Sequence, residues 1–133
     1  MPVATSAHAA AFWAGLHIIL LLTLSILVVR KRQHHRIALG DGGIPDLARA
    51  IRTFGNATEY VPAGLATLAL FAVFDAAPVV VHLLGLMLFV GRVTHAIGLW
   101  RSGEATLARA VGVTITWIAY VFASVALLFY AVA

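Results

Sequence analysis

The sequence contains no cysteine and has few charged residues. Without cysteine the chain cannot form disulfides, iron–sulfur clusters or thiolate zinc sites, so any thiol chemistry must use a sulfur atom supplied by a substrate. Only 11% of the 133 residues are charged and 62% are hydrophobic, whereas soluble domains usually have about 25% charged and about 45–50% apolar residues. The composition therefore predicts an integral membrane protein.

Four long segments carry almost no charge. Crossing the hydrocarbon core takes roughly 20 apolar residues in a helix, and no segment shows the alternation of a strand. The pattern predicts an all-α membrane protein, a bundle of four transmembrane helices in one domain that covers residues 1–133. The expected spans are approximately residues 9–29, 47–74, 78–100 and 107–132.

Basic residues outnumber acidic residues by nine to five, a balance that nucleic-acid-binding proteins often show. Their positions argue against a nucleic-acid partner, because all nine lie in or beside the first and third connections. The positive-inside rule places these connections in the cytoplasm and both termini outside. The basic residues are Arg30, Lys31, Arg32, Arg36, Arg49, Arg52, Arg92, Arg101 and Arg109.

Charged groups at bilayer depth cost about 2.5–3.5 kcal/mol each on insertion scales and usually face a cavity or a partner. At a rise of about 1.5 Å per residue, Glu59 and Arg92 both lie roughly 21–23 Å below the outer surface. This matching depth predicts either an ion pair or a shared polar ligand, in a pocket that opens toward the cytoplasm. Steps of three and four residues place further polar side chains beside them: Arg49, Arg52, Asn56, Tyr60 and His95.

The starts of two spans also suit an anionic ligand. Asp46 and Thr106 are residue types that cap helix N-termini, which predicts helices beginning just after them. Arg49 and Arg109 then fall in first turns, where the helix dipole favours anions over cations. Arginine is mildly disfavoured in a first turn unless an anionic ligand binds to it.

The pattern Arg52-x-x-x-Asn56-x-x-Glu59-Tyr60-x-Pro62 resembles the signature of the MAPEG superfamily (membrane-associated proteins in eicosanoid and glutathione metabolism). That superfamily includes microsomal glutathione transferases, prostaglandin E synthase and the non-catalytic 5-lipoxygenase-activating protein. The third span, from Gly91 through His95, resembles the prostaglandin-synthase branch and its small bacterial relatives. The resemblance implies a homotrimer in a bacterial inner membrane, with glutathione held between subunits near the cytoplasmic face.

The resemblance also implies roles for individual residues. Arg109 resembles the arginine that stabilises the glutathione thiolate, whereas Leu99 departs from the pattern, because the eicosanoid enzymes place a tyrosine there. The chemistry fits independently, since the two carboxylates of glutathione suit arginine and its α-ammonium suits Glu59. The expected glutathione contacts are Arg30, Arg52, Asn56, Glu59, Tyr60, Arg92 and His95.

The leading hypothesis is a membrane-bound glutathione transferase, with glutathione peroxidase activity left open, that uses glutathione as co-substrate and takes hydrophobic electrophiles from the bilayer. The alternative is a non-catalytic lipid-binding or scaffold protein of the same fold, in which Glu59 and Arg92 form a structural pair. The histidines lack metal-ligand spacing, so no metal is expected. His17 and His82 are predicted to be packed or hydrogen-bonded locally.

Overall fold

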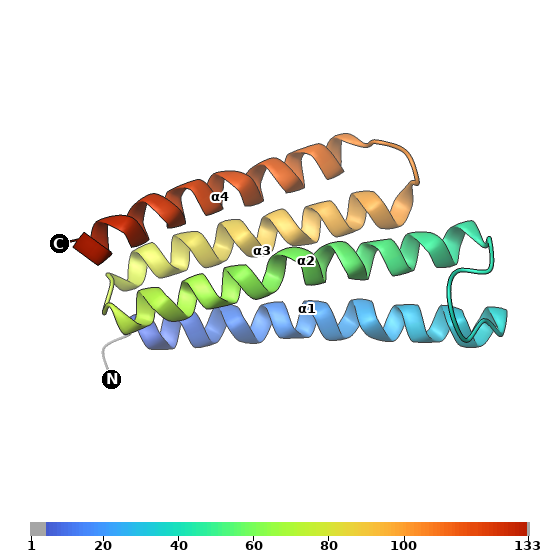
Figure 1. Ribbon diagram of the computed structural model, residues 1–133, viewed down its shortest axis with the longest axis horizontal. Coiled ribbons are helices and arrows are strands. Elements are labelled where there is room, and N and C mark those ends of the chain that lie inside the picture. The colour runs from blue at the N-terminus through green and yellow to red at the C-terminus, as the bar shows by residue number, and fades with distance from the viewer. Residues whose placement is uncertain (1–4, 133) are drawn as a thin grey trace.

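The computed structural model describes residues 5–132. They form four helices: α1 (Ser6–His35), α2 (Pro45–Val73), α3 (Pro78–Arg101) and α4 (Leu107–Val132). No strand occurs in this range, so the all-α prediction is confirmed. The helices run up and down side by side, and the α1–α2 and α3–α4 connections share one end of the bundle (Figure 1). We call it the connection end; α1 begins and α4 finishes at the opposite end.

Three of the four helices, α1, α3 and α4, are long and apolar enough to cross a membrane. α2 is long enough but less apolar than the other three helices, because it carries Arg49, Arg52 and Glu59. Its 29 residues extend roughly 43 Å, longer than the hydrocarbon core of about 30 Å. The prediction of clear spans is confirmed for three helices, and the crossing of α2 stays a prediction.

The start of α2 differs from the one expected at an Asp46 cap. The helix begins at Pro45, with Ile44 in the cap position and no side-chain hydrogen bond to it. Proline suits a first helical position because its φ is preset and its missing N–H would have no partner there. Asp46 instead accepts a hydrogen bond from Lys31 Nζ at 2.7 Å and lies 3.1 Å from His35 Nε2. The prediction of Asp46 as a cap is wrong, and this carboxylate ties α2 to the end of α1.

The start of α4 agrees with expectation. Thr106 Oγ1 accepts a hydrogen bond from the backbone N–H of Arg109 at 3.3 Å, which is the contact of a helix cap. Arg109 therefore lies in the first turn of α4, as the sequence predicted.

α2 and α3 are the inner helices, since each packs against the other three, whereas the backbones of α1 and α4 do not approach each other within the described residues. α3 and α4 approach most closely at Gly91 and Gly112. A Cβ on Gly112 would lie 2.7 Å from the Gly91 carbonyl oxygen, and a Cβ on Gly91 would lie 2.7 Å from Thr116 Oγ1. This close packing brings polar groups of α4 next to the charged face of α3.

The opposite half of the bundle is held by aromatic packing. Trp13 is buried and donates from Nε1 to His82 Nδ1 at 3.1 Å. His17 is also buried, and its Nδ1 lies 2.7 Å from the Trp13 carbonyl oxygen. The prediction of a local hydrogen bond is confirmed for His17, whereas His82 is packed against Trp13 of α1 and bonded to it across two helices.

Candidate functional site

The polar residues predicted on α2 and α3 meet at one level of the bundle. The Asn56 amide joins them, because its Oδ1 accepts from Arg92 Nη1 at 2.9 Å and its Nδ2 donates to Glu59 Oε2 at 3.4 Å. Arg52 Nη1 lies 2.8 Å from Glu59 Oε1. We call this group the polar layer; with the neighbouring tyrosine it comprises Arg52, Asn56, Glu59, Tyr60 and Arg92.

Glu59 and Arg92 do not form the direct ion pair that was one of the two expectations. Glu59 pairs with Arg52, two turns earlier on the same helix, and Asn56 stands between the carboxylate and Arg92. Among residues 5–132, no carboxylate lies within 4 Å of the Arg92 guanidinium. The geometry thus excludes the direct pair, and the shared ligand stays a prediction.

Arg92 is the most deeply enclosed charge of the polar layer, with 3% of its surface exposed. Its Nε donates to Thr116 Oγ1 at 3.0 Å, and the guanidinium carbon lies 4.5 Å from the centre of the Tyr60 ring. The second terminal nitrogen, Nη2, is buried without a hydrogen-bond partner in the described part of the chain. Leaving a buried donor unsatisfied costs about 1–3 kcal/mol, and more when the group is charged. An acceptor on a ligand would remove that cost.

Two α4 residues complete the polar layer and were missed by sequence reasoning. Thr116 bonds Arg92, and the Tyr120 hydroxyl donates to the Tyr60 carbonyl oxygen. The Tyr60 and Tyr120 rings also stack, with an interplanar angle of 12°. A usable signal existed, since Thr116 follows Arg109 by seven residues and Tyr120 follows Thr116 by four, which places all three on one face of a helix.

Arg109 lies toward the connection end, and its side chain faces the α3–α4 connection. Its Nη1 donates to the carbonyl oxygens of Glu104 at 2.7 Å and Gly103 at 3.4 Å. His95 joins this region to α3, because its Nδ1 lies 3.0 Å from the Arg109 carbonyl oxygen. The hydrogen bonds of these two residues hold the start of α4 in place, and none of them reaches the polar layer.

The remaining predicted arginines lie apart from Arg92. Arg30 is exposed near the end of α1. Arg49, one turn before Arg52, has a buried Nε without a hydrogen-bond partner in the described chain. The side chains of Arg52 and Glu59 are 59% and 51% exposed, so this part of the polar layer is open on one side.

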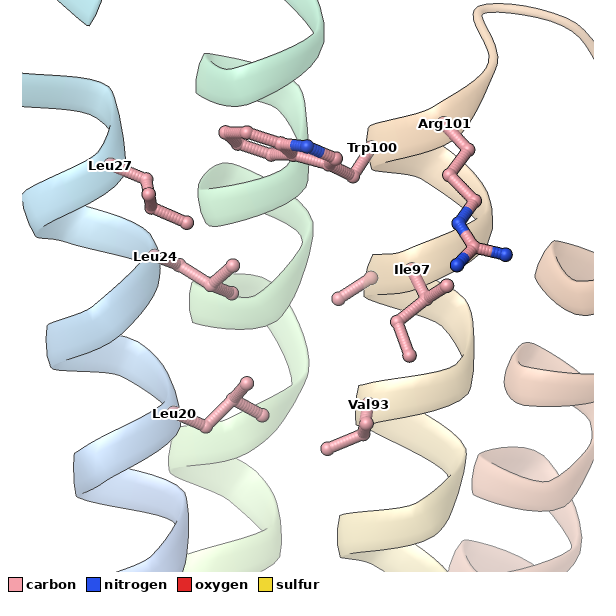
Figure 2. A pocket seen from close by; sticks show the side chains of 8 residues that line it. Leu20, Leu24, Leu27, Val93, Ile97, Trp100 and Arg101 are labelled. Atoms are coloured by element: carbon pink, nitrogen blue, oxygen red, sulfur yellow. The ribbon is translucent and has the colours of Figure 1, made fainter. Parts of the chain in front are cut away.

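A groove of about 320 Å³ lies between α1 and α3 near the connection end (Figure 2). None of the predicted glutathione contacts lines it. Within residues 5–132, no cluster of three or more histidine, aspartate or glutamate side chains is arranged to hold a metal ion.

Comparison with known proteins agrees with the sequence resemblance. The profile of the MAPEG family matches residues 10–129. The inner membrane protein YecN of Escherichia coli (strain K12) is 36% identical over 120 residues, which cover 90% of this chain and 90% of YecN. YecN of Escherichia coli O6:H1 (strain CFT073) matches with the same identity and coverage.

Proposed function

The chain belongs to the MAPEG family, and from this premise we propose that it is a membrane-bound glutathione transferase. It conjugates the glutathione thiolate to hydrophobic electrophiles that enter from the bilayer, and hydroperoxide reduction is a related reaction of the same thiolate. An inner-membrane location is supported by the name of YecN and by three helices able to span a membrane. The basic connection end faces the cytoplasm by the positive-inside rule.

The observation that carries the proposal is the incomplete hydrogen bonding of Arg92. A buried guanidinium with no carboxylate nearby and one unsatisfied nitrogen suits an anionic ligand. A carboxylate of glutathione supplies both the negative charge and the acceptor. The Tyr60 ring and Thr116 hold the guanidinium in one orientation, so binding needs little rearrangement of that side chain.

The other charges of the polar layer suit the rest of glutathione. Glu59 presents a half-exposed carboxylate that can receive the α-ammonium group. Arg52 pairs with Glu59 in this structure. When the ammonium group of glutathione takes the place of Arg52 on Glu59, Arg52 is free to bind the carboxylate next to that ammonium. Binding of a zwitterionic ligand thus breaks the ion pair between Arg52 and Glu59 and forms two new pairs, one from each residue to the ligand.

Exposure of the polar layer supports a homotrimer in which α2 also crosses the membrane. Two half-exposed charges on a helix packed beside membrane spans need a cover other than lipid. A neighbouring subunit provides that cover, and its Arg30, exposed near the end of α1, is then available as a further glutathione contact.

Arg109 is the proposed catalytic residue. A model thiol has a pKa of about 8.5, so only a few per cent is ionised at neutral pH, and a nearby guanidinium raises the reactive fraction. Arg109 donates to neutral carbonyl oxygens, and no carboxylate within residues 5–132 lies within 4 Å of it. Its charge is therefore not compensated, and turning the side chain away from the α3–α4 connection makes it available to the thiolate.

A second candidate function rests on the same residue. The two hydrogen bonds from Arg109 to the connection favour a purely structural role. The protein would then bind glutathione or lipid without turnover, as a scaffold of the same fold.

One purified sample decides between the two functions. Glutathione binding is measured by calorimetry in detergent, and conjugation to chlorodinitrobenzene, a generic aromatic electrophile, is followed on the same preparation. The transferase proposal predicts saturable binding and enzyme-dependent conjugation. Binding without conjugation to this or other electrophiles supports the scaffold, and absence of binding contradicts both glutathione roles.

A further inference from the structure

The groove between α1 and α3 has apolar walls and one polar end. Figure 2 shows leucines of α1 facing apolar residues of α3 across the groove, with the Trp100 ring lying over its upper end. Arg101 starts at the same end and is exposed, and its guanidinium extends back along α3 beside Ile97 (Figure 2). The labelled walls are Leu20, Leu24, Leu27, Val93 and Ile97.

The groove is separate from the polar layer because it uses another face of α3. Successive residues of an α-helix are turned by about 100°, so Val93 points well away from Arg92. Ile97 follows Val93 by four residues and Trp100 follows Ile97 by three, so all three share one face of α3. The groove opens beside α1, whereas Arg92 points to Asn56 of α2 and Thr116 of α4.

The dimensions suit a lipid chain that lies along the helices. Leu20 to Leu27 on one wall, and Val93 to Trp100 on the other, each cover seven residue steps, which is about 10.5 Å. One leaflet of a hydrocarbon core of about 30 Å is roughly 15 Å deep. The groove therefore covers about two thirds of the leaflet next to the connection end, and its volume falls within the usual range of ligand sites, about 300–1,000 Å³.

The polar end of the groove is basic. Lys31 lies over the Trp100 ring, 5.3 Å from its centre, and is held there by Asp46. Because Asp46 already neutralises Lys31, the charge that remains for a ligand at the groove belongs to Arg101. No carboxylate of the described residues lies within 4 Å of its guanidinium.

We propose that this groove binds an anionic phospholipid of the leaflet at the connection end. One acyl chain lies against the leucines of α1 beneath Trp100, and the headgroup phosphate pairs with Arg101. Basic sites between membrane helices recognise anionic headgroups in this way. A zwitterionic lipid fits the apolar walls equally well but gains less from Arg101, so the site distinguishes lipids by charge.

Quenching of tryptophan fluorescence by bromine tests the proposal. The full chain with Trp117→Phe, which removes an exposed indole on α4, is placed in phosphatidylcholine nanodiscs. Increasing fractions of chain-brominated phosphatidylglycerol or chain-brominated phosphatidylcholine are then introduced. Trp13 is buried in the other half of the bundle, so the quenched signal reports on Trp100, and Trp100→Phe checks that assignment.

We expect half-maximal quenching at an about five-fold lower fraction of the anionic lipid, the preference that one basic residue near the surface provides. Arg101→Gln should remove the preference, and Val93→Phe, which fills the groove, should reduce quenching by both lipids. Arg36→Asn is the matched control, because it removes a charge at the same end and asparagine tolerates the left-handed backbone of that position, where φ is 56°.

Three results would overturn the proposal. Equal quenching by the two lipids would show that the groove does not prefer an anionic headgroup. A preference that survives in Arg101→Gln would show that Arg101 is not the residue that binds the headgroup. Absence of quenching by either lipid means that Trp100 is shielded, as it would be if a second copy of the chain covered the groove.

Discussion

Replacing Gly112 by alanine should separate α3 from α4 and disturb Arg92 without touching it. The added Cβ would meet the backbone nitrogen of His95 first, and it would lie 2.7 Å from the Gly91 carbonyl oxygen, about 0.7 Å inside ordinary van der Waals contact at 3.4 Å. The obstacle is backbone, which cannot rotate away as a side chain can. Overpacking of this kind costs typically 1–3 kcal/mol, and the separation should lengthen the 3.0 Å contact between Arg92 and Thr116.

Thermal unfolding in detergent, with glutathione binding on the same samples, measures both effects. Gly55→Ala is the matched control, since it is also a glycine-to-alanine change inside a helix and its Cβ meets nothing within 4 Å. Alanine is the better helix former by roughly 1 kcal/mol, so the control should unfold at the same or a higher temperature. If Gly112→Ala were as stable as Gly55→Ala, the close approach of α3 and α4 would be refuted.

Two further predictions concern Asp46 and Arg109. Lys31, and to a lesser extent His35, hold the pKa of the Asp46 carboxyl below its ordinary range. Because the folded pKa is depressed, this carboxylate adds stability above the unfolded pKa of about 3.9, and that contribution is lost as pH falls below it. The unfolding temperature of Asp46→Asn should therefore drop less than that of the wild type between pH 5 and pH 3; equal drops would contradict this. Arg109→Ala should lower turnover about ten- to a hundred-fold, the value of one charge-assisted hydrogen bond of about 1.5–3 kcal/mol, with little loss of affinity. Arg109→Lys should be intermediate, and identical pKa values of the bound thiol in all three proteins would remove Arg109 from the mechanism.

The fold was predictable from the sequence because nearly all the information lies in local composition. Long segments with few charges give the helices, and Thr106 gives the start of α4. Asp46 shows the limit of this reasoning, since an acidic residue near a helix start can cap the helix or pair with another element. Only the packing of α1 on α2, which brings Lys31 within 2.7 Å, decides between the two.

Part of the polar layer was predictable from the sequence, but its internal connections were not. Helical spacing places Asn56 and Glu59 on one face, and counting residues sets Glu59 level with Arg92. The contacts among these groups depend on how α2 and α3 are rotated about their own axes. In the structure, Asn56 lies between Glu59 and Arg92. Spacing places Thr116 on the same face of α4 as Arg109, but its contact with Arg92 depends on the close approach of α3 and α4, which spacing does not encode.

The glutathione affinity of Arg92→Met is the most direct test of the claim that the polar layer binds this ligand. Losing one charge-assisted hydrogen bond of about 1.5–3 kcal/mol should weaken binding about 10- to 150-fold. Without glutathione the variant should remain folded, because the loss of the hydrogen bonds from Arg92 to Asn56 and Thr116 is offset in part by removing a buried charge with an unsatisfied nitrogen. Arg36→Asn should bind as the wild type does. Unchanged affinity in Arg92→Met, or a variant that loses its fold before it loses binding, would contradict the account and leave Arg92 a structural residue.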